Sequence, residues 1–171
     1  MSKENFTTIT KELLHEHFYY ANGILCWKKQ SKNKSRNLNS ECGSIHHTGY
    51  RVVHFMNKQF RIHRLIFLYH HGYLPKCIDH IDGNKLNNKI ENLREATIKQ
   101  NGWNRKLSSN NKTGIKGISW VKKYNKWQVY CKTNYKSYFL GYFDSFNDAK
   151  EKIISFRKEH HGEFARITNE F

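Results

Sequence analysis

Residues 77–101 read CIDHIDGNKLNNKIENLREATIKQN, and this stretch decides the fold. Asp79 and His80 follow an apolar residue, as at the end of a short buried strand, and a loop rich in Gly and Asn comes next. The apolar pattern returns at residues 93–96, which can pair back on the first strand. We therefore expect a β-hairpin that carries Asp79 and His80 on its first strand.

A helix is expected directly after this hairpin. Thr97 is followed three residues later by Gln100, which is the spacing of a capping box at a helix start. Asn101 would then lie in the first turns of a helix packed over the strand that carries Asp79 and His80. The segment is thus predicted to run strand, loop, strand and helix.

Residue types of this kind suit the cleavage of a phosphodiester. The reaction needs an activated water, an electrophile that neutralises the phosphorane, and help for the departing oxygen. An imidazole titrates near working pH and can act as the base, and a site of one carboxylate and one amide suits Mg²⁺ or Mn²⁺ rather than zinc. Spacing alone leaves a second interpretation open, a plain loop whose aspartate and histidine make turn hydrogen bonds.

Charge indicates the class of partner. The 171 residues include 30 Lys and Arg against 14 Asp and Glu, a formal net charge of +16. Residues 17–76 hold ten basic residues and one acid, residues 112–136 hold seven lysines and no acid, and residues 144–163 are mixed. Two separated basic blocks suggest two contact surfaces on one polyanion, with nucleic acid as the default partner and generic polyanion binding as the alternative.

Composition also excludes several classes of protein. No stretch approaches the ~18 apolar residues of a membrane span, residues 1–20 show no secretory signal peptide, and an aromatic content of 15% argues against disorder. The four cysteines show no CxxC pair, so we expect small buried side chains in a reducing compartment rather than zinc ligands.

Before the hairpin, periodicity predicts a helix over 8–20, a turn at Asn22-Gly23 and a strand over 24–27. A polar loop over 28–41 and a second hairpin over 49–62, turning at Asn57-Lys58, should follow. Residues 63–71 form a short helix candidate, ended by Gly72 and by Pro75, the only proline. Residues 104–116 are the best candidate for a linker.

The middle of the chain resembles the HNH endonuclease motif (the ββα-metal finger) in the H-N-N form of phage and intron-encoded homing endonucleases. The residues that carry the resemblance are His63-Arg64-Leu65, Gly72, Pro75, Ile78-Asp79-His80-Ile81-Asp82-Gly83-Asn84, Asn87-Asn88, Glu91-Asn92-Leu93-Arg94-Glu95-Ala96-Thr97, Gln100-Asn101 and Asn104. It implies that Asp79 and Asn101 ligate one divalent metal, Mg²⁺ or Mn²⁺, and that His80 is the general base.

The same resemblance assigns supporting roles. Asn92 is the implied middle Asn, which bonds loop backbone and so orients His80, and Asp82 is expected to be a turn residue rather than a second ligand. Asn101 stands where many relatives have histidine, which favours Mg²⁺ over zinc. Four arginines are candidate DNA contacts, with an ordinary solvated surface as the alternative: Arg61, Arg64, Arg94 and Arg105.

The C-terminal part predicts a small α+β module. Strand-like runs cover 117–122, 127–133 and 138–143, and a helix over 145–160 follows. Period-two alternation turns Trp127, together with the alternate residues after it, toward the helix.

This part resembles the apetala-two/ethylene-response-factor DNA-binding domain, in which the exposed face of a three-stranded sheet enters the major groove. The resemblance rests on Thr113-Gly114-Ile115-Lys116-Gly117-Ile118-Ser119-Trp120, Lys126-Trp127-Gln128-Val129, Leu140-Gly141-Tyr142-Phe143 and Ala149. The predicted outward, DNA-facing residues are Lys116, Ser119, Gln128, Tyr130, Lys132, Ser137 and Phe139. Ser119 and Ser137 stand where that family usually has guanine-reading arginines.

The fold expected is α+β: a nuclease domain over 1–107 with its ββα-metal core at about 77–107, a linker over 108–116, and the DNA-binding domain over 117–171. The function expected is a metal-dependent DNA endonuclease, homing-type and phage-encoded, acting on double-stranded DNA in the cytoplasm of a bacterial host. One site per chain favours a monomer that nicks, with no membrane and no small-molecule cofactor. The alternatives are a non-catalytic DNA-binding regulator and a structured-RNA binder.

Overall fold

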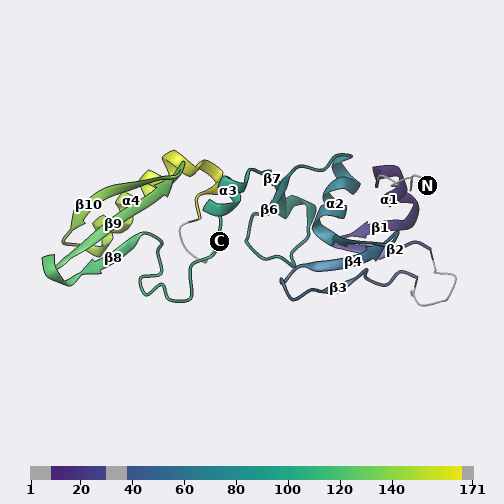
Figure 1. Ribbon diagram of the computed structural model, residues 1–171, viewed down its shortest axis with the longest axis horizontal. Helices are drawn as coiled ribbons and strands as arrows, with labels where there is room; N and C mark the ends of the chain where they lie inside the picture. Colours follow the sequence, from purple (N-terminus) through teal and green to yellow (C-terminus); the bar gives the residue numbers. More distant parts are fainter. Residues whose placement is uncertain (1–8, 30–37, 167–171) are drawn as a thin grey trace, which may run out of the picture. The chain divides into compact units, whose positions relative to one another are not determined.

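The computed structural model describes residues 9–29 and 38–166, and the chain divides between Glu95 and Ala96 into two units (Figure 1). Helix α3 (Ile98–Trp103) belongs to the second unit because it contacts the short 3-10 helix η3 (Gly162–Phe164). The sequence instead assigned this helix to a nuclease domain that ends at residue 107. Each unit is described by itself below.

The first unit opens with α1 (Lys11–His17), which is capped by the Thr10 side chain. Strands β1 (Phe18–Ala21) and β2 (Ile24–Trp27) form an antiparallel hairpin across the predicted turn. The predicted helix over 8–20 is thus too long at its C-terminal end, and residue 8 lies outside the described residues. The strand begins at Phe18 because its fully buried side chain pairs with Trp27 across the hairpin.

A three-stranded antiparallel sheet follows, with β3 (Ser44–Ile45), β4 (Arg51–Phe55) and β5 (Lys58–Arg61) in that order. The β4–β5 turn is formed by Met56 and Asn57, whose φ values of 49° and 59° give the left-handed turn that hairpins favour. It lies one residue earlier than predicted. Strand β3 was not predicted, because a strand of two exposed residues has no alternation to detect.

Helix α2 (Ile62–His71) confirms the predicted helix and begins one residue earlier. It ends at Gly72, whose φ of 78° is the left-handed conformation of a C-terminal cap. The helix packs its apolar face into one core with α1, the β1–β2 hairpin and β4. Buried members of this core are Leu14, Phe18, Leu25, Trp27, Cys42, Val53, Phe55, Ile62, Leu65, Ile66, Phe67, Leu68, Ile78 and Leu93.

The decisive hairpin is present as predicted. Strand β6 (Cys77–His80) pairs with β7 (Leu93–Ala96), and the 3-10 helix η1 (Ile90–Asn92) leads into the second strand. Ile78 and Leu93 anchor the two strands in the core of the first unit. The hairpin thereby fixes the positions of Asp79 and His80, which follow Ile78 on β6.

The second unit confirms the predicted sheet and helix. Strands β8 (Ile118–Val121), β9 (Lys126–Thr133) and β10 (Lys136–Phe143) form an antiparallel sheet in the order β10-β9-β8, and α4 (Phe146–His161) packs on one face (Figure 1). The 3-10 helix η2 (Lys122–Tyr124) joins β8 to β9. The core between sheet and helix comprises Ile115, Ile118, Val129, Cys131, Ala149 and Ile153.

Two irregularities shape this sheet. The register of β10 on β9 shifts between Phe139 and Gly141, so Phe139 lies opposite Tyr130 and Tyr142 opposite Gln128. Gly117 has φ +84°, and a Cβ there would lie 2.1 Å from the Tyr130 carbonyl oxygen. Only glycine therefore lets the chain enter β8 this close to β9.

The capping box that opens α3 is confirmed. The Thr97 hydroxyl accepts from the Gln100 backbone, and the Gln100 side chain accepts from the Thr97 N–H. Among the described residues, no helix is long and apolar enough to cross a membrane.

Candidate functional site

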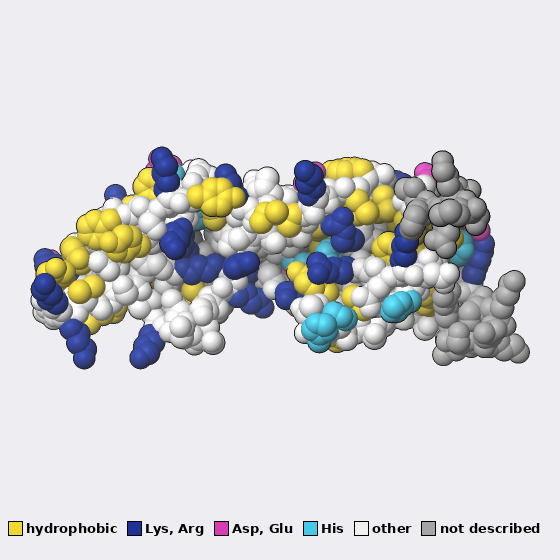
Figure 2. Space-filling view, in the orientation of Figure 1, with side chains coloured by type: hydrophobic (Ala, Val, Ile, Leu, Met, Phe, Trp, Pro, Cys, Tyr) yellow, Lys and Arg dark blue, Asp and Glu magenta, His cyan; other side chains and the backbone are white. Residues whose placement is uncertain are grey.

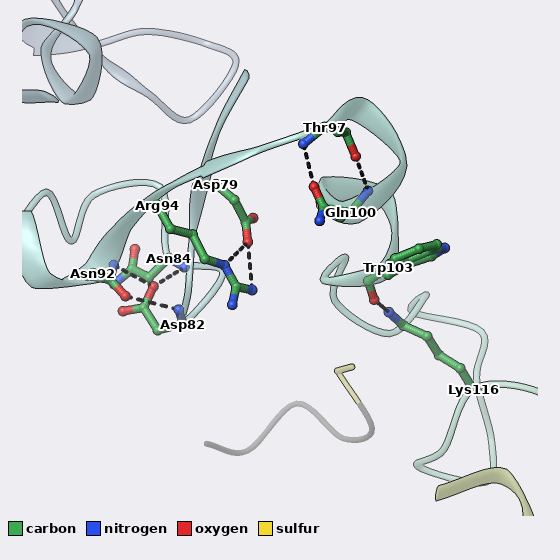
Figure 3. Close-up of polar contacts among 9 residues, drawn as sticks. All are labelled: Asp79, Asp82, Asn84, Asn92, Arg94, Thr97, Gln100, Trp103 and Lys116. Carbon is green, nitrogen blue, oxygen red and sulfur yellow. Dashed lines mark hydrogen bonds and ion pairs between the residues drawn. The ribbon is translucent and has the colours of Figure 1, made fainter. Parts of the chain in front are cut away.

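Asp79 forms a buried ion pair with Arg94. The Asp79 carboxylate is on β6 and Arg94 on β7, and Arg94 Nε and one terminal nitrogen lie 3.0 Å and 2.9 Å from Asp79 Oδ2 (Figure 3). The two side chains are only 4% and 13% exposed. Arg94 was predicted as a candidate DNA contact, with an ordinary solvated surface as the alternative. Its guanidinium is directed at the predicted metal ligand Asp79, because the paired strands place the two side chains together.

His80 is buried next to Asp79 and is held by Asn88. The Asn88 Oδ1 atom lies 3.0 Å from His80 Nε2, and since a carbonyl oxygen only accepts, Nε2 carries the proton. The rings of His63 and Tyr50 lie beside it, with centroid distances of 5.0 Å and 6.1 Å to the His80 ring. These contacts fix both the orientation and the tautomer of the imidazole.

Burial sets the protonation state of both imidazoles. Removal from water lowers the pKa of His80, against the opposing effects of the Asn88 hydrogen bond and the Asp82 and Asp79 carboxylates. Burial lowers the pKa of His63 to about 3, assisted by His80 and two arginines. A neutral His80 with Nε2 protonated keeps its lone pair on Nδ1, the form that a proton acceptor needs.

The loop between β6 and β7 is ordered by Asn92 and Asp82. The Asn92 side chain donates to the Asn87 carbonyl at 2.7 Å and to Asp82 Oδ1 at 3.0 Å, and it accepts from the Asp82 N–H at 3.0 Å. Asp82 also accepts from the Asn84 N–H (Figure 3) and from Asn87 Nδ2. Burial alone would raise the pKa of Asp82, but these hydrogen bonds hold it below its usual value.

This network makes Asp82 a turn residue, as the sequence suggested. Asn92 bonds the loop, and Asn88 is the residue that contacts His80. Asn88 belongs to the quoted family motif but was given no role, since several asparagines in one loop give no signal for the buried one. His63 was likewise quoted without a role and Tyr50 was missed, because both approach His80 from separate elements.

Asn101, the other predicted metal ligand, lies on α3 in the second unit and is partly buried, and Asn104 caps that helix. Among the described residues, no three His, Cys, Asp or Glu side chains gather as a metal cluster. The donor types nevertheless fit a hard divalent cation, since a carboxylate and an amide both supply hard oxygen donors.

The other predicted arginines differ in their surroundings. Arg61 is exposed and stacks 4.6 Å above the Tyr50 ring, while Arg64 donates to the Pro75 carbonyl at 3.2 Å. Arg105 is exposed in the second unit. Arg61 and Arg105 are thus open to solvent, whereas Arg64 supports the chain after α2.

The sheet face away from α4 carries most of the predicted outward residues. Ser119, Tyr130, Lys132, Ser137 and Phe139 are exposed on this face. Gln128 is partly buried, and its amide donates to the Tyr142 hydroxyl at 3.0 Å.

Lys116 is a correction to the predicted face. It precedes β8 rather than projecting from it, and its ammonium donates to the Trp103 carbonyl (Figure 3) and to the Arg105 carbonyl. Burial, assisted by Arg157 and two further arginines, lowers the pKa of Lys116 to about 8. The lysine therefore connects parts of the second unit internally.

Beside β8 the second unit has a basic groove of about 910 Å³. It runs between the segment after α3 and the exposed edge of the sheet, and its floor includes Trp120 and Trp127. Its basic lining residues are Arg105, Lys106, Lys112, Lys116 and Lys122. None of the described residues that line it is an acid, so the groove is suited to an anionic polymer.

Comparisons with known proteins identify relatives of this chain, and the family match includes Asp79, His80 and Asn101. The profile of the HNH endonuclease family matches residues 60–103. Protein 3.8 of Escherichia phage T7 is 40% identical over 98 residues, covering 56% of this chain and 80% of that protein. An uncharacterized HNH endonuclease of Acanthamoeba polyphaga mimivirus is 47% identical over 75 residues, covering 42% of this chain and 39% of that protein. No solved structure matches.

Proposed function

Since the chain belongs to the HNH endonuclease family, we propose that it is a metal-dependent, homing-type DNA endonuclease in which His80 is the general base. The observation that carries this proposal is the buried, oriented imidazole of His80 next to the Asp79 carboxylate. A solvated turn histidine would need neither the Asn88 hydrogen bond nor the enclosing rings.

In the proposed reaction, His80 accepts a proton from the attacking water at Nδ1. Asn88 holds the ring through Nε2, and Asn92 keeps the loop between the strands in place. Asp79 and Asn101 would hold Mg²⁺ or Mn²⁺, which supplies Lewis-acid stabilisation of charge on the phosphate. Arg94 fixes the Asp79 carboxylate through Oδ2 and neutralises part of its charge.

DNA contacts are proposed at two basic surfaces. Exposed Arg61 in the first unit and the groove lined by Arg105 in the second would neutralise backbone phosphates. We propose that the second unit acts as an apetala-two-like DNA-binding domain that holds the duplex through this basic groove rather than by reading bases with its sheet face. One general base per chain favours nicking of double-stranded DNA by a monomer in the host cytoplasm, with phage origin supported by the similarity to protein 3.8 of phage T7.

The test is conversion of supercoiled plasmid to nicked circles with Mg²⁺ or Mn²⁺, followed by sequencing of the ends cut from host and phage genomic DNA. His80→Ala should lower the rate by about 10²–10⁴-fold. His47→Ala, at an exposed histidine of the same unit, is the matched control and should cleave normally. A parent protein that never cleaves with any divalent metal, yet binds DNA, would favour the regulator instead.

A further inference from the structure

Four aromatic rings form a continuous row on the sheet face away from α4. Tyr124 lies against Tyr142, Tyr142 against Phe139, and Phe139 against Tyr130, with 5.1 Å between ring centroids at each step. The four side chains are 39–49% exposed. We call these four residues the aromatic row.

The row exists because of the irregularity in β10. With strict alternation Phe139 and Tyr142 would lie on opposite sides of the sheet, and one inserted residue between them is needed to bring both to the same side. The register shift after Phe139 supplies that residue, so Phe139 faces Tyr130 and Tyr142 faces Gln128 across the ladder. Exposed rings gathered in one place indicate a binding surface rather than a core.

The remaining chemistry of this face is poor for reading base-pair edges in a duplex. Such readout depends on Arg, Lys, Asn and Gln that reach donors and acceptors in the major groove. Here Ser119 and Ser137 are short, and the Gln128 amide donates to the Tyr142 hydroxyl. Rings cannot stack on bases that are already stacked within a duplex, whereas every unpaired base offers a face to a ring.

Charge around the row matches a nucleic-acid backbone. Residues 112–136 hold seven lysines and no acid. Lys123 lies 5.4 Å from the Tyr124 ring centroid, and Lys132 is exposed on the same face as Tyr130. Figure 2 shows hydrophobic side chains gathered over the β9–β10 region with Lys and Arg among and beside them. Rings between lysines form the combination that binds single strands without strict sequence preference.

We propose that the aromatic row binds unpaired bases of single-stranded DNA by stacking, with the neighbouring lysines on its phosphates. The choice of DNA rests on the proposed function. The surface would hold a strand that is already opened, or the flap beside a nick, while sites elsewhere contact duplex.

The experiment is fluorescence anisotropy with labelled 12-nucleotide probes and the full chain carrying His80→Ala, so that binding is measured without cleavage. The probes are oligo-dT, an abasic strand with the same phosphates, a 12-base-pair duplex and oligo-rU at one salt concentration. Oligo-dT should bind at least about tenfold more tightly than the abasic strand. Phe139→Ala should weaken oligo-dT binding by about 5- to 100-fold and leave abasic binding unchanged.

Two controls separate stacking from other effects. Phe139→Trp should retain oligo-dT affinity and Phe139→Leu should lose it, although both keep an apolar side chain. Tyr135→Ala removes a ring that is 90% exposed and outside the row, and it should bind like the parent. Circular dichroism verifies that each variant folds. Folding is expected, because the substituted side chains are half exposed.

Several results would overturn the proposal. Equal affinity for oligo-dT and the abasic strand, tighter binding of oligo-rU than of oligo-dT, or no effect of Phe139→Ala on oligo-dT binding would each exclude base stacking on DNA. Duplex binding through the other sites should be unchanged by Phe139→Ala, and an equal loss of duplex and oligo-dT binding would also overturn the proposal. A dimer that Phe139→Ala converts to monomer in sedimentation would make the row a contact between copies of the chain. Binding is measured with a variant that does not need to cleave. The test of base stacking can therefore succeed or fail whether or not the nuclease assay detects cleavage.

Discussion

At the residue scale, the ion pair of Asp79 and Arg94 lies in the candidate site and also contributes to the stability of the fold. Arg94→Met should leave a buried carboxylate without its cation and lower the free energy of unfolding by about 3–5 kcal/mol. Urea unfolding followed by tryptophan fluorescence measures the change. The cost is large because Asp79 is only 3% exposed and water cannot replace the guanidinium.

The double variant Asp79→Asn with Arg94→Met is the control for this prediction. Removing both charges should recover most of the lost stability, since replacing a buried pair as a whole costs far less than breaking it. A single variant that unfolds at the parent's urea concentration would show that the pair contributes nothing.

Asn88 is the second residue whose contacts predict an effect on activity. Asn88→Ala removes the acceptor that holds His80 Nε2, so kcat should fall about 10- to 100-fold while KM stays near that of the parent. Nicking of supercoiled plasmid at several DNA concentrations separates the two constants. Asn147→Ala, at an exposed asparagine on α4, should cleave normally. Equal kcat for parent and Asn88→Ala would exclude the positioning role.

Asp79 and His80 could be identified from the sequence because they are neighbours on one strand of a local hairpin. Asn88, His63 and Tyr50 could not, because their approach to His80 depends on tertiary packing of separate elements. Arg94 shows the same limit, because the sequence alone does not distinguish an exposed surface arginine from the buried ion-pair partner of Asp79.

At the scale of elements, two glycines make a matched pair in the second unit. Gly114 and Gly117 have φ values of +72° and +84°, but a Cβ on Gly114 meets nothing within 4 Å, whereas one on Gly117 meets the Tyr130 carbonyl at 2.1 Å. Each Gly→Ala change should cost about 1–3 kcal/mol for the backbone conformation. Gly117→Ala should cost more, because β8 and β9 must separate.

Thermal unfolding of the two variants compares them directly. The midpoint for Gly117→Ala should lie clearly below that for Gly114→Ala. Equal midpoints would mean that the strands can move apart at no cost and that the close approach is unimportant.

The junction of α4 and α3 predicts a pH dependence. His161 stacks on Trp103 at 4.3 Å, and burial, with Arg157 nearby, lowers the pKa of His161 to about 4. Between about pH 6.5 and pH 4 the unfolded chain therefore binds a proton that the folded chain does not, so stability is full above pH 6.5 and falls as the pH drops.

His161→Phe keeps a ring on Trp103 and removes the titration. The free energy of unfolding should then depend less steeply on pH between 6.5 and 4 than in the parent, as measured by urea unfolding at several pH values. His47→Phe, at an exposed histidine, should keep the parent's slope. An unchanged slope for His161→Phe would assign the acid sensitivity to other groups.

Elements were predicted well where pattern and packing agree. In β9 the alternation is regular, and Val129 and Cys131 lie in the core as expected. Prediction was wrong where geometry interrupts the pattern: β1 begins inside an apparently helical stretch because Phe18 pairs with Trp27. The strand β10 was predicted, but its register shift has no signal in the alternation. The prediction also placed Lys116 on the outward face of the sheet, although Lys116 precedes β8.

At the scale of the whole molecule, charge connects the units to one kind of partner. The net charge of +16 is concentrated in residues 17–76 of the first unit and 112–136 of the second. Each unit therefore supplies its own basic surface, and both can neutralise phosphates of the same polymer. The relation that tests this is the dependence of affinity on salt, because counterions are released in proportion to the phosphates contacted.

Affinity of the His80→Ala chain for a duplex should fall linearly on a log–log plot against salt. If the groove contacts the backbone, Lys112→Ala and Lys122→Ala should each make the slope shallower by about 0.9, since each removes one phosphate contact. Lys150→Ala, on the mixed-charge helix α4, removes the same charge and should leave the slope unchanged. Equal shifts for all three variants would mean that the duplex responds to net charge alone, whereas a shift confined to the groove lysines assigns them to the backbone contact.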